Sequence, residues 1–223
     1  MRVIVFDAGS RVGARVTEEL VRRGHRVTGV VRRPVSAAPP GSPVRFVRGD
    51  LRDRATVSAV LPGHDAAVSA IGRPGRGRGT DLNAATSTLL EGLREARGPR
   101  VLVVEERGWA PAKRSTGGEA VPERAAEAPG APARSTFDLL REEQEVDWTY
   151  VCPEGPVADG KRTGGYHTGI DPHGGGPPAR TLSLADLAVA VADELESPRH
   201  ARRRLLVSAV EPSTGSSRDR APR

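Results

Sequence analysis

Short apolar runs alternate with amphipathic stretches along the chain, beginning at its first residues. Residues 2–6 (RVIVF) read as a buried strand, and residues 12–23 place valines and a leucine on one face of a helix that ends at Gly24. Further strands are predicted over residues 26–31, 44–47, 65–70, 100–104, 147–151 and 204–210, and further helices over residues 51–61, 82–96, 135–145 and 184–196, with Asp53 and Ser183 as N-caps. Strands that alternate with helices in this way predict an α/β fold, a doubly wound parallel sheet with helices on both faces.

The length of 223 residues suits a single domain with a core of its own. We expect that domain to span residues 1–210. Residues 105–134 interrupt the alternation with proline, alanine, glycine, glutamate and arginine, which predicts an irregular loop. The short polar segment 211–223 is expected to be a disordered tail.

The formal net charge of +6 raises the question of a nucleic-acid partner. The basic residues are almost all arginine and are scattered among 28 acidic residues, while aromatic residues make up only 3% of the chain. A basic stripe interleaved with stacking side chains is therefore missing, and no zinc-finger or RNA-recognition motif is matched. The composition disfavours nucleic-acid binding.

Two sequence features bear on the cellular location: the length of the apolar stretches and the number of cysteines. No apolar stretch approaches a membrane span, and the first residues lead into a strand rather than a signal segment. The single cysteine, Cys152, lies in the apolar run WTYVCP, which predicts a buried structural thiol. We expect a cytoplasmic protein without membrane contact.

One string of residues has the composition of a metal site. His167, Asp171 and His173 lie close together in a glycine-rich segment, but their spacing matches no zinc or iron motif. We therefore predict no metal.

The stretch DAGSRVG, residues 7–13, joins the first strand to the first helix. In dinucleotide-binding folds a glycine-rich turn occupies this place, and the helix N-terminus after it binds phosphate. The position of residues 7–13 thus raises the question of a nucleotide cofactor.

Several segments together resemble one known family. They are RGHRVTGVVRRP at 23–34, VRGDLRD at 47–53, GHDAAVSAIG at 63–72, VDWTYVCP at 146–153, GKRTGGY at 160–166 and LSLADLAVAVADELESPRHARRR at 182–204. With the first turn, they resemble the atypical short-chain dehydrogenase/reductases, in particular the NmrA-like NAD(P)H-binding group that includes flavin and biliverdin reductase-type enzymes. The resemblance covers most of residues 1–210 and implies a Rossmann-like domain.

The first turn departs from the family pattern Gly-Ala-Thr-Gly-x-x-Gly. The third glycine, which lets the helix pack closely on the strand, is kept as Gly13, whereas the first two are replaced by Asp7 and Ser10. A carboxylate about 4 Å from a phosphate costs about 1 kcal/mol in water and about 4 kcal/mol at a partly shielded site. Two compensations are open: the Ser10 hydroxyl could donate to phosphate, or Gly9 could take over the turn.

The resemblance implies a cofactor site around this turn and the ends of two further strands. Arginines stand where the phosphates would lie, which favours NADP over NAD. The predicted cofactor-binding residues are Gly9, Ser10, Arg11, Val12, Gly13, Arg32, Arg33, Ser69, Ala70 and Ile71.

Chemistry is expected at the carboxyl ends of the strands, where ligands of open α/β sheets bind. The Tyr-x-x-x-Lys pair of typical short-chain dehydrogenases is absent, since Glu154 follows Tyr150 and Ile170 follows Tyr166 at that spacing. The candidate acid–base residues are Glu105, Glu106, Glu154 and Tyr166, and the candidate substrate-binding residues are Trp109, Lys161, Arg162 and His167.

Three functions are compatible with these residues. The leading hypothesis is an NAD(P)H-dependent reductase acting on a small quinone, flavin-like or carbonyl substrate. The first alternative is a cofactor-independent protein on the same fold, either a cyclase, dehydratase or isomerase or a templating protein for small, aromatic molecules. The second is an NmrA-like nucleotide-sensing regulator. All three predict a small-molecule ligand, and a homodimer is one option for the assembly.

Overall fold

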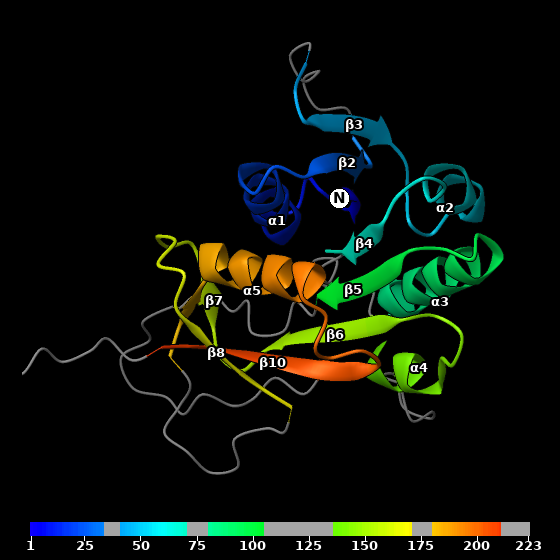
Figure 1. The fold of residues 1–223 in the computed structure, drawn as a ribbon. Coiled ribbons are helices and arrows are strands. Elements are labelled where there is room, and N and C mark those ends of the chain that lie inside the picture. The colour runs from blue at the N-terminus through cyan, green and yellow to red at the C-terminus, as the bar shows by residue number, and fades with distance from the viewer. Residues whose placement is uncertain (34–40, 71–79, 105–135, 171–179, 211–223) are drawn as a thin grey trace, which may run out of the picture.

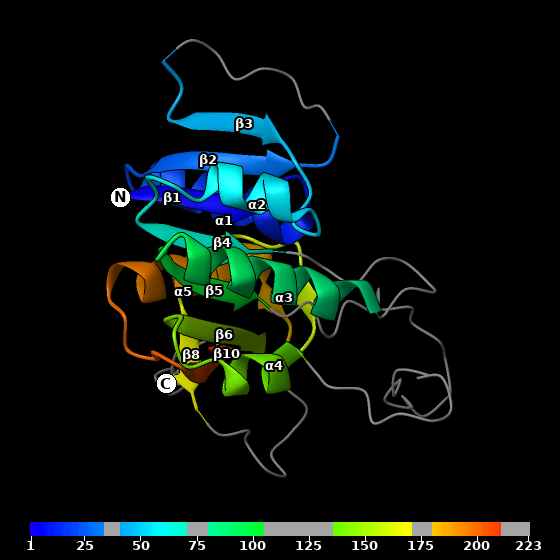
Figure 2. The same ribbon diagram turned by 90° about the vertical axis from the view of Figure 1, so that its right-hand side faces the viewer.

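The computed structural model describes residues 1–33, 41–70, 80–104, 136–170 and 180–210. Its main sheet contains β1 (Arg2–Phe6), β2 (Arg26–Val31), β3 (Val44–Arg48), β4 (Ala66–Ser69), β5 (Arg100–Val104), β6 (Trp148–Pro153), β8 (Tyr166–Gly169) and β10 (Arg203–Ala209). These strands lie in the order β3-β2-β1-β4-β5-β6-β10-β8, which Figure 2 shows from one edge of the sheet to the other. The first six follow the order of a Rossmann fold.

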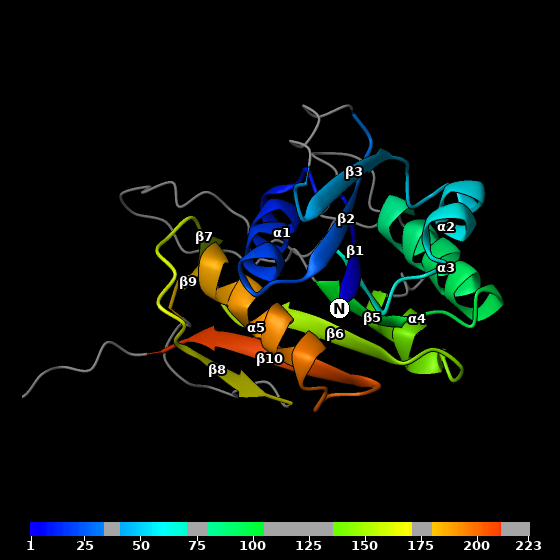
Figure 3. The same ribbon diagram turned by 45° about the horizontal axis from the view of Figure 1, so that its top comes forward.

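Helices cover both faces of this sheet, as predicted (Figures 1 and 3). On one face lie α1 (Arg11–Arg22) and α5 (Leu184–Glu196), and on the other lie α2 (Arg54–Val60), α3 (Thr80–Glu95) and α4 (Thr136–Glu142). Each face has its own apolar core: Val16 and Leu187 belong to the first, and Leu89 and Leu140 to the second. The predicted doubly wound α/β sheet is confirmed.

Side-chain caps fix where three helices begin. Ser10, Asp53 and Ser183 accept hydrogen bonds from backbone N–H groups in the first turns of α1, α2 and α5, respectively. The predicted caps Asp53 and Ser183 are thus confirmed. Because Asp53 is the cap, α2 begins at Arg54, and the predicted start at residue 51 was wrong.

The second half of the chain differs from the prediction in its short elements. Strand β8 pairs antiparallel with β10, with Tyr166 opposite Ala209, so the sheet is not wholly parallel. Two further strands, β7 (Val157–Ala158) and β9 (Leu182–Ser183), form a small parallel pair. Sequence periodicity missed all three because strands of two to four residues carry little pattern.

The predicted irregular loop 105–134 and the predicted tail 211–223 lie outside the described residues. Within the residues that the structure does describe, no helix is both long and apolar enough to span a membrane.

Candidate functional site

The carboxyl ends of the central strands meet at one edge of the sheet. Strand register places the last residue of β1, Phe6, beside Ser69 of β4 and Val30 of β2. Ser69 in turn lies beside Val103 of β5. The segments that follow these strands therefore converge, as required for a ligand site in an open α/β sheet.

The turn after β1 is closed by Asp7 rather than by glycine. Asp7 has a left-handed backbone with φ of 56°, and its carbonyl accepts a 2.8 Å hydrogen bond from the Ser10 N–H group. Aspartate is one of the few non-glycine residues that adopt this conformation readily. Gly9 has no positive φ, so the alternative that Gly9 takes over the turn was wrong.

Ser10 uses its hydroxyl for the scaffold. The oxygen accepts a 3.0 Å hydrogen bond from the Gly13 N–H group, and the hydroxyl donates to the carbonyl of Ala70, 3.1 Å away at the end of β4. A serine hydroxyl has one proton to donate. The alternative in which Ser10 donates to a phosphate is therefore not the arrangement observed.

Gly13 brings the first turn of α1 close to the backbone of the turn after β1. A Cβ atom added there would lie 2.3 Å from the Asp7 carbonyl oxygen and 2.8 Å from the Ala8 Cα atom. Both are backbone atoms, so no side-chain rearrangement could make room for it. The neighbouring Val12 is buried in the core beneath the turn. The packing role assigned to Gly13 from the sequence is thus confirmed.

Opposite charges gather where β1, β2 and β3 end. Arg32 follows β2, and its Nη2 atom lies 3.8 Å from Oδ1 of Asp7, whose side chain is only 18% exposed. Burial raises the pKa of the Asp7 carboxyl; Arg32 opposes this shift and Asp50 adds to it. Asp50, which follows β3, is held by Arg52 at 2.6 Å, and the hydrogen bonds from Arg52 lower the pKa of Asp50.

The other predicted cofactor-binding residues that the structure describes lie at the same edge. Arg33 follows Arg32 and is exposed. Arg11 begins α1, and its Nη2 atom forms a 2.7 Å ion pair with Asp159, both side chains being more than half exposed. Ser69 and Ala70 are buried at the end of β4. The first turn of α1 and the cations beside it therefore fit the phosphate end of a dinucleotide, while Asp7 opposes it.

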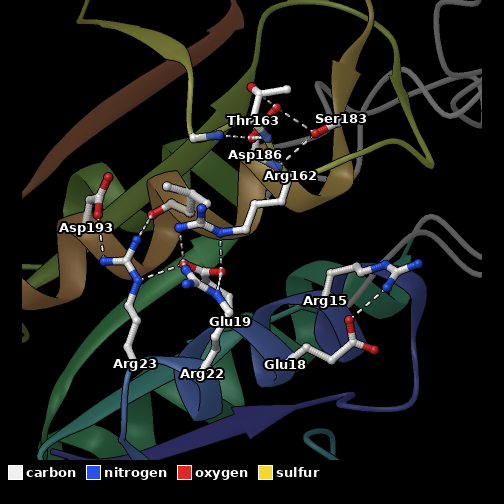
Figure 4. A network of polar contacts seen from close by, with 12 residues as sticks. Arg15, Glu18, Glu19, Arg22, Arg23, Arg162, Thr163, Ser183, Asp186 and Asp193 are labelled. Atoms are coloured by element: carbon white, nitrogen blue, oxygen red, sulfur yellow. Dashed lines mark hydrogen bonds and ion pairs between the residues drawn. The ribbon is translucent and has the colours of Figure 1, made fainter.

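The segment GKRTGGY, which contains the predicted substrate-binding residues Lys161 and Arg162, is tied to α1 and α5 (Figure 4). The Nε atom of Arg162 lies 2.9 Å from Glu19, which is about 12 Å along α1 from its first turn. The N–H groups of Thr163 and Gly164 each donate a 2.7 Å hydrogen bond to Asp186 of α5. The charge of Arg162 is thus paired with a buried carboxylate, and its predicted role in substrate binding stays a prediction. Lys161 is exposed in the same segment.

Tyr166 and His167 lie on the edge strand β8 and point to opposite faces of the sheet. The Tyr166 hydroxyl donates a hydrogen bond to Asp193 of α5. Burial, followed by this contact, raises the pKa of the Tyr166 phenol beyond its ordinary value. Tyr166 therefore joins α5 to β8, and its predicted acid–base role stays a prediction. His167 is exposed and pairs in register with Ser208.

Glu154 follows β6 at the carboxyl edge. It is partly buried, and its backbone N–H group donates a 3.0 Å hydrogen bond to the carbonyl of Val207. The remaining predicted residues, Ile71, Glu105, Glu106 and Trp109, lie outside the described part of the chain. Within that part, no cluster of histidine, cysteine, aspartate and glutamate could hold a metal ion.

Asp50 is the residue at this edge that sequence reasoning did not select. It lies within VRGDLRD, two residues after the third strand, and the rule that ligands gather at carboxyl ends could have identified it.

Comparison with known proteins agrees with this geometry. A family model described as NAD(P)H-binding matches residues 8–198. Among curated proteins, the uncharacterized protein YwnB of Bacillus subtilis is 29% identical over 220 residues, which cover 93% of this chain and 98% of YwnB.

Solved structures with sequence identities of 26% and 29% share the fold. A proposed exported protein of Burkholderia pseudomallei is 29% identical with a TM-score of 0.71, covering 93% of this chain and 99% of that one. A proposed NADH-flavin reductase of Streptococcus pneumoniae is 26% identical with a TM-score of 0.65, covering 94% of this chain and 100% of that one. The family match, which spans far more than half of the residues, settles membership. This chain belongs to the NAD(P)H-binding family, within the NmrA-like short-chain dehydrogenase/reductases that it resembles in sequence.

Proposed function

We propose that the chain is an NAD(P)H-dependent oxidoreductase that prefers NADPH and reduces a small quinone, flavin-like or carbonyl compound. The observation that carries this proposal is the turn between β1 and α1. It keeps the packing at Gly13 that brings the helix N-terminus to the carboxyl edge of the sheet. A helix N-terminus in this position attracts the pyrophosphate of a dinucleotide through its N–H groups and its dipole.

The preference for NADPH rests on Arg32 and Arg33. Both directly follow β2, the strand whose end approaches the adenosine ribose in Rossmann folds. An acidic residue in that region binds the ribose hydroxyls of NAD, whereas arginine accommodates the additional phosphate of NADP. Arg32 is 59% exposed and Arg33 is exposed, so both guanidinium groups are accessible to a ligand.

The proposed substrate class rests on similarity to a solved structure and on an acid–base residue at the carboxyl edge of the sheet. The Streptococcus pneumoniae relative is a proposed NADH-flavin reductase. A bound nicotinamide supplies hydride, and the protein orients it and excludes competing reactions. Glu154 directly follows β6 and lies among the described residues. We propose that its carboxyl group exchanges a proton with the substrate.

The test is NADPH oxidation in the presence of a panel of quinones, flavins and small carbonyl compounds. Arg32→Ala should weaken the binding of NADPH more than the binding of NADH, because only NADPH carries the additional phosphate. Arg26→Ala is the matched control, since Arg26 is also exposed but begins β2 at the opposite edge. Equal effects of the two variants, or no oxidation with any acceptor, would overturn the proposal.

One observation favours a second candidate, a cofactor-independent protein on the same scaffold. The Asp7 carboxylate stands at the turn where phosphate must approach, and Asp50 adds negative charge nearby. This candidate predicts no binding of NADPH or NADH, together with retained binding of a small molecule at the same edge.

A further inference from the structure

Three strand ends place two carboxylates and one guanidinium together at the carboxyl edge. Asp7 follows β1, Arg32 follows β2 and Asp50 follows β3. The Asp7 and Arg32 atoms are 3.8 Å apart, outside hydrogen-bond distance, and Asp50 acts on Asp7 as a like charge.

The two carboxylates differ in how their charge is compensated. Arg52 donates to Asp50 through Nε at 3.0 Å, through Nη2 at 2.6 Å and through its backbone N–H at 3.0 Å. Asp7 is buried more deeply, and Arg32 lies 3.8 Å from it. Asp50 is therefore held in its ionised form, whereas burial and the like charge of Asp50 favour protonation of Asp7 against the attraction of Arg32.

We propose that Asp7 is a selectivity residue that links dinucleotide binding to uptake of a proton: the cofactor binds with Asp7 protonated, and its phosphate replaces the Asp7 carboxylate as the partner of Arg32. This inference rests on the proposed function. It assigns to Asp7 a role that glycine at this position cannot have.

The sign of the linkage follows from the charges. Burial already raises the pKa of Asp7 in the free protein. A bound phosphate adds negative charge near Asp7 and engages Arg32, and both effects raise that pKa further. The affinity for the cofactor should therefore fall as the pH rises from the pKa of Asp7 in the free protein to its higher pKa in the complex. Above that higher pKa the affinity should level off.

The linkage should be larger for the cofactor that carries more negative charge near Arg32. NADP has one more phosphate than NAD, so the ionised form of Asp7 disfavours NADP more strongly. The preference for NADP over NAD should accordingly increase as the pH falls.

Isothermal titration calorimetry with NADP⁺ and NAD⁺ tests the proposal from about pH 4, near the ordinary pKa of an aspartate, up to about pH 8. Repeating each titration in buffers of different ionisation enthalpy gives the number of protons taken up. The central variant is Asp7→Asn, because asparagine keeps the size of the side chain and tolerates the left-handed backbone. The NADP⁺ phosphate itself titrates at about pH 6, but it does so with both proteins and cancels in their difference.

Wild type is expected to take up more protons than Asp7→Asn on binding NADP⁺. Near the upper pH, Asp7→Asn should bind NADP⁺ at least about tenfold more tightly than wild type. Asp65→Asn is the control, since Asp65 lies before β4 at the opposite edge and should retain the wild-type pH dependence.

The outcomes separate the two proposals. Binding of NADP⁺ with equal proton uptake in wild type and Asp7→Asn would overturn the role of Asp7 and leave the proposed function intact. No binding of either nucleotide by wild type, Asp7→Asn or Asp7→Gly would overturn both.

Discussion

Replacing Gly13 by alanine tests the packing that holds the phosphate turn against the helix. The added Cβ atom would lie 2.3 Å from the Asp7 carbonyl oxygen, 2.8 Å from the Ala8 Cα atom and 2.9 Å from the Asp7 carbonyl carbon. Favourable contacts between carbon atoms need about 3.5–4.0 Å, so the backbone of the turn must shift by about 1 Å. Overpacking of this kind costs about 1–3 kcal/mol, of which the better helix propensity of alanine recovers at most about 1 kcal/mol.

At about 2–4 °C per kcal/mol for a chain of this length, a net loss of about 2 kcal/mol lowers the melting temperature by about 4–8 °C. Thermal and urea unfolding of Gly13→Ala would measure the loss. Gly9→Ala is the matched control, because its Cβ atom would make only a 3.7 Å contact with Val31 and its φ is not positive. The control should change the unfolding free energy by less than about 0.5 kcal/mol. Equal stability of the two variants would refute the assignment of Gly13 as a close contact between α1 and the turn.

Three further substitutions test the network around this turn and the helices. Ser10→Ala should lower the unfolding free energy by about 1 kcal/mol through loss of the N-cap, and Ser10→Gly by clearly less; equal losses in urea unfolding would contradict the capping role. Burial alone would raise the pKa of Glu19, but hydrogen bonds from Arg162, Arg22 and Arg23 lower it from 4.5 to about 2. The stability that ionised Glu19 contributes is therefore complete above pH 4.5 and is lost as the pH falls toward 2, so Glu19→Gln should flatten the acid limb of the stability profile; a profile as steep as that of wild type would exclude this effect. Tyr166→Phe should lower the melting temperature and leave kcat with NADPH unchanged; a lower kcat at unchanged stability would restore Tyr166 as a proton donor.

Long, strongly patterned elements could be predicted from the sequence because their periodicity reflects burial. The helix at Leu184–Glu196 was predicted with its bounds and its cap at Ser183, and β5 was predicted with its bounds. By contrast, the helix predicted over residues 135–145 ends at Glu142, where no glycine or proline marks the boundary. The strand at Tyr166–Gly169 depends on pairing with β10 rather than on a pattern of its own.

The candidate site was predictable in position but not in its detailed contacts. The order of strands and helices placed the turn, Arg32 and Ser69 at one edge. The sequence did not reveal that Ser10 directs its hydroxyl to Ala70, or that Arg162 pairs with Glu19, since both contacts join residues distant in the chain. Such tertiary contacts decide whether a charged residue serves the fold or a ligand.

We infer that this altered turn still binds a nicotinamide dinucleotide, and direct titration tests this claim most simply. Purified protein would be titrated with NADPH and with NADH by calorimetry at modest salt. Micromolar binding of NADPH and weaker binding of NADH are expected, because the first turn of α1 and the cations after β2 remain at the carboxyl edge. Absence of binding by either cofactor up to millimolar concentration would contradict the claim and favour a cofactor-independent role for the same edge.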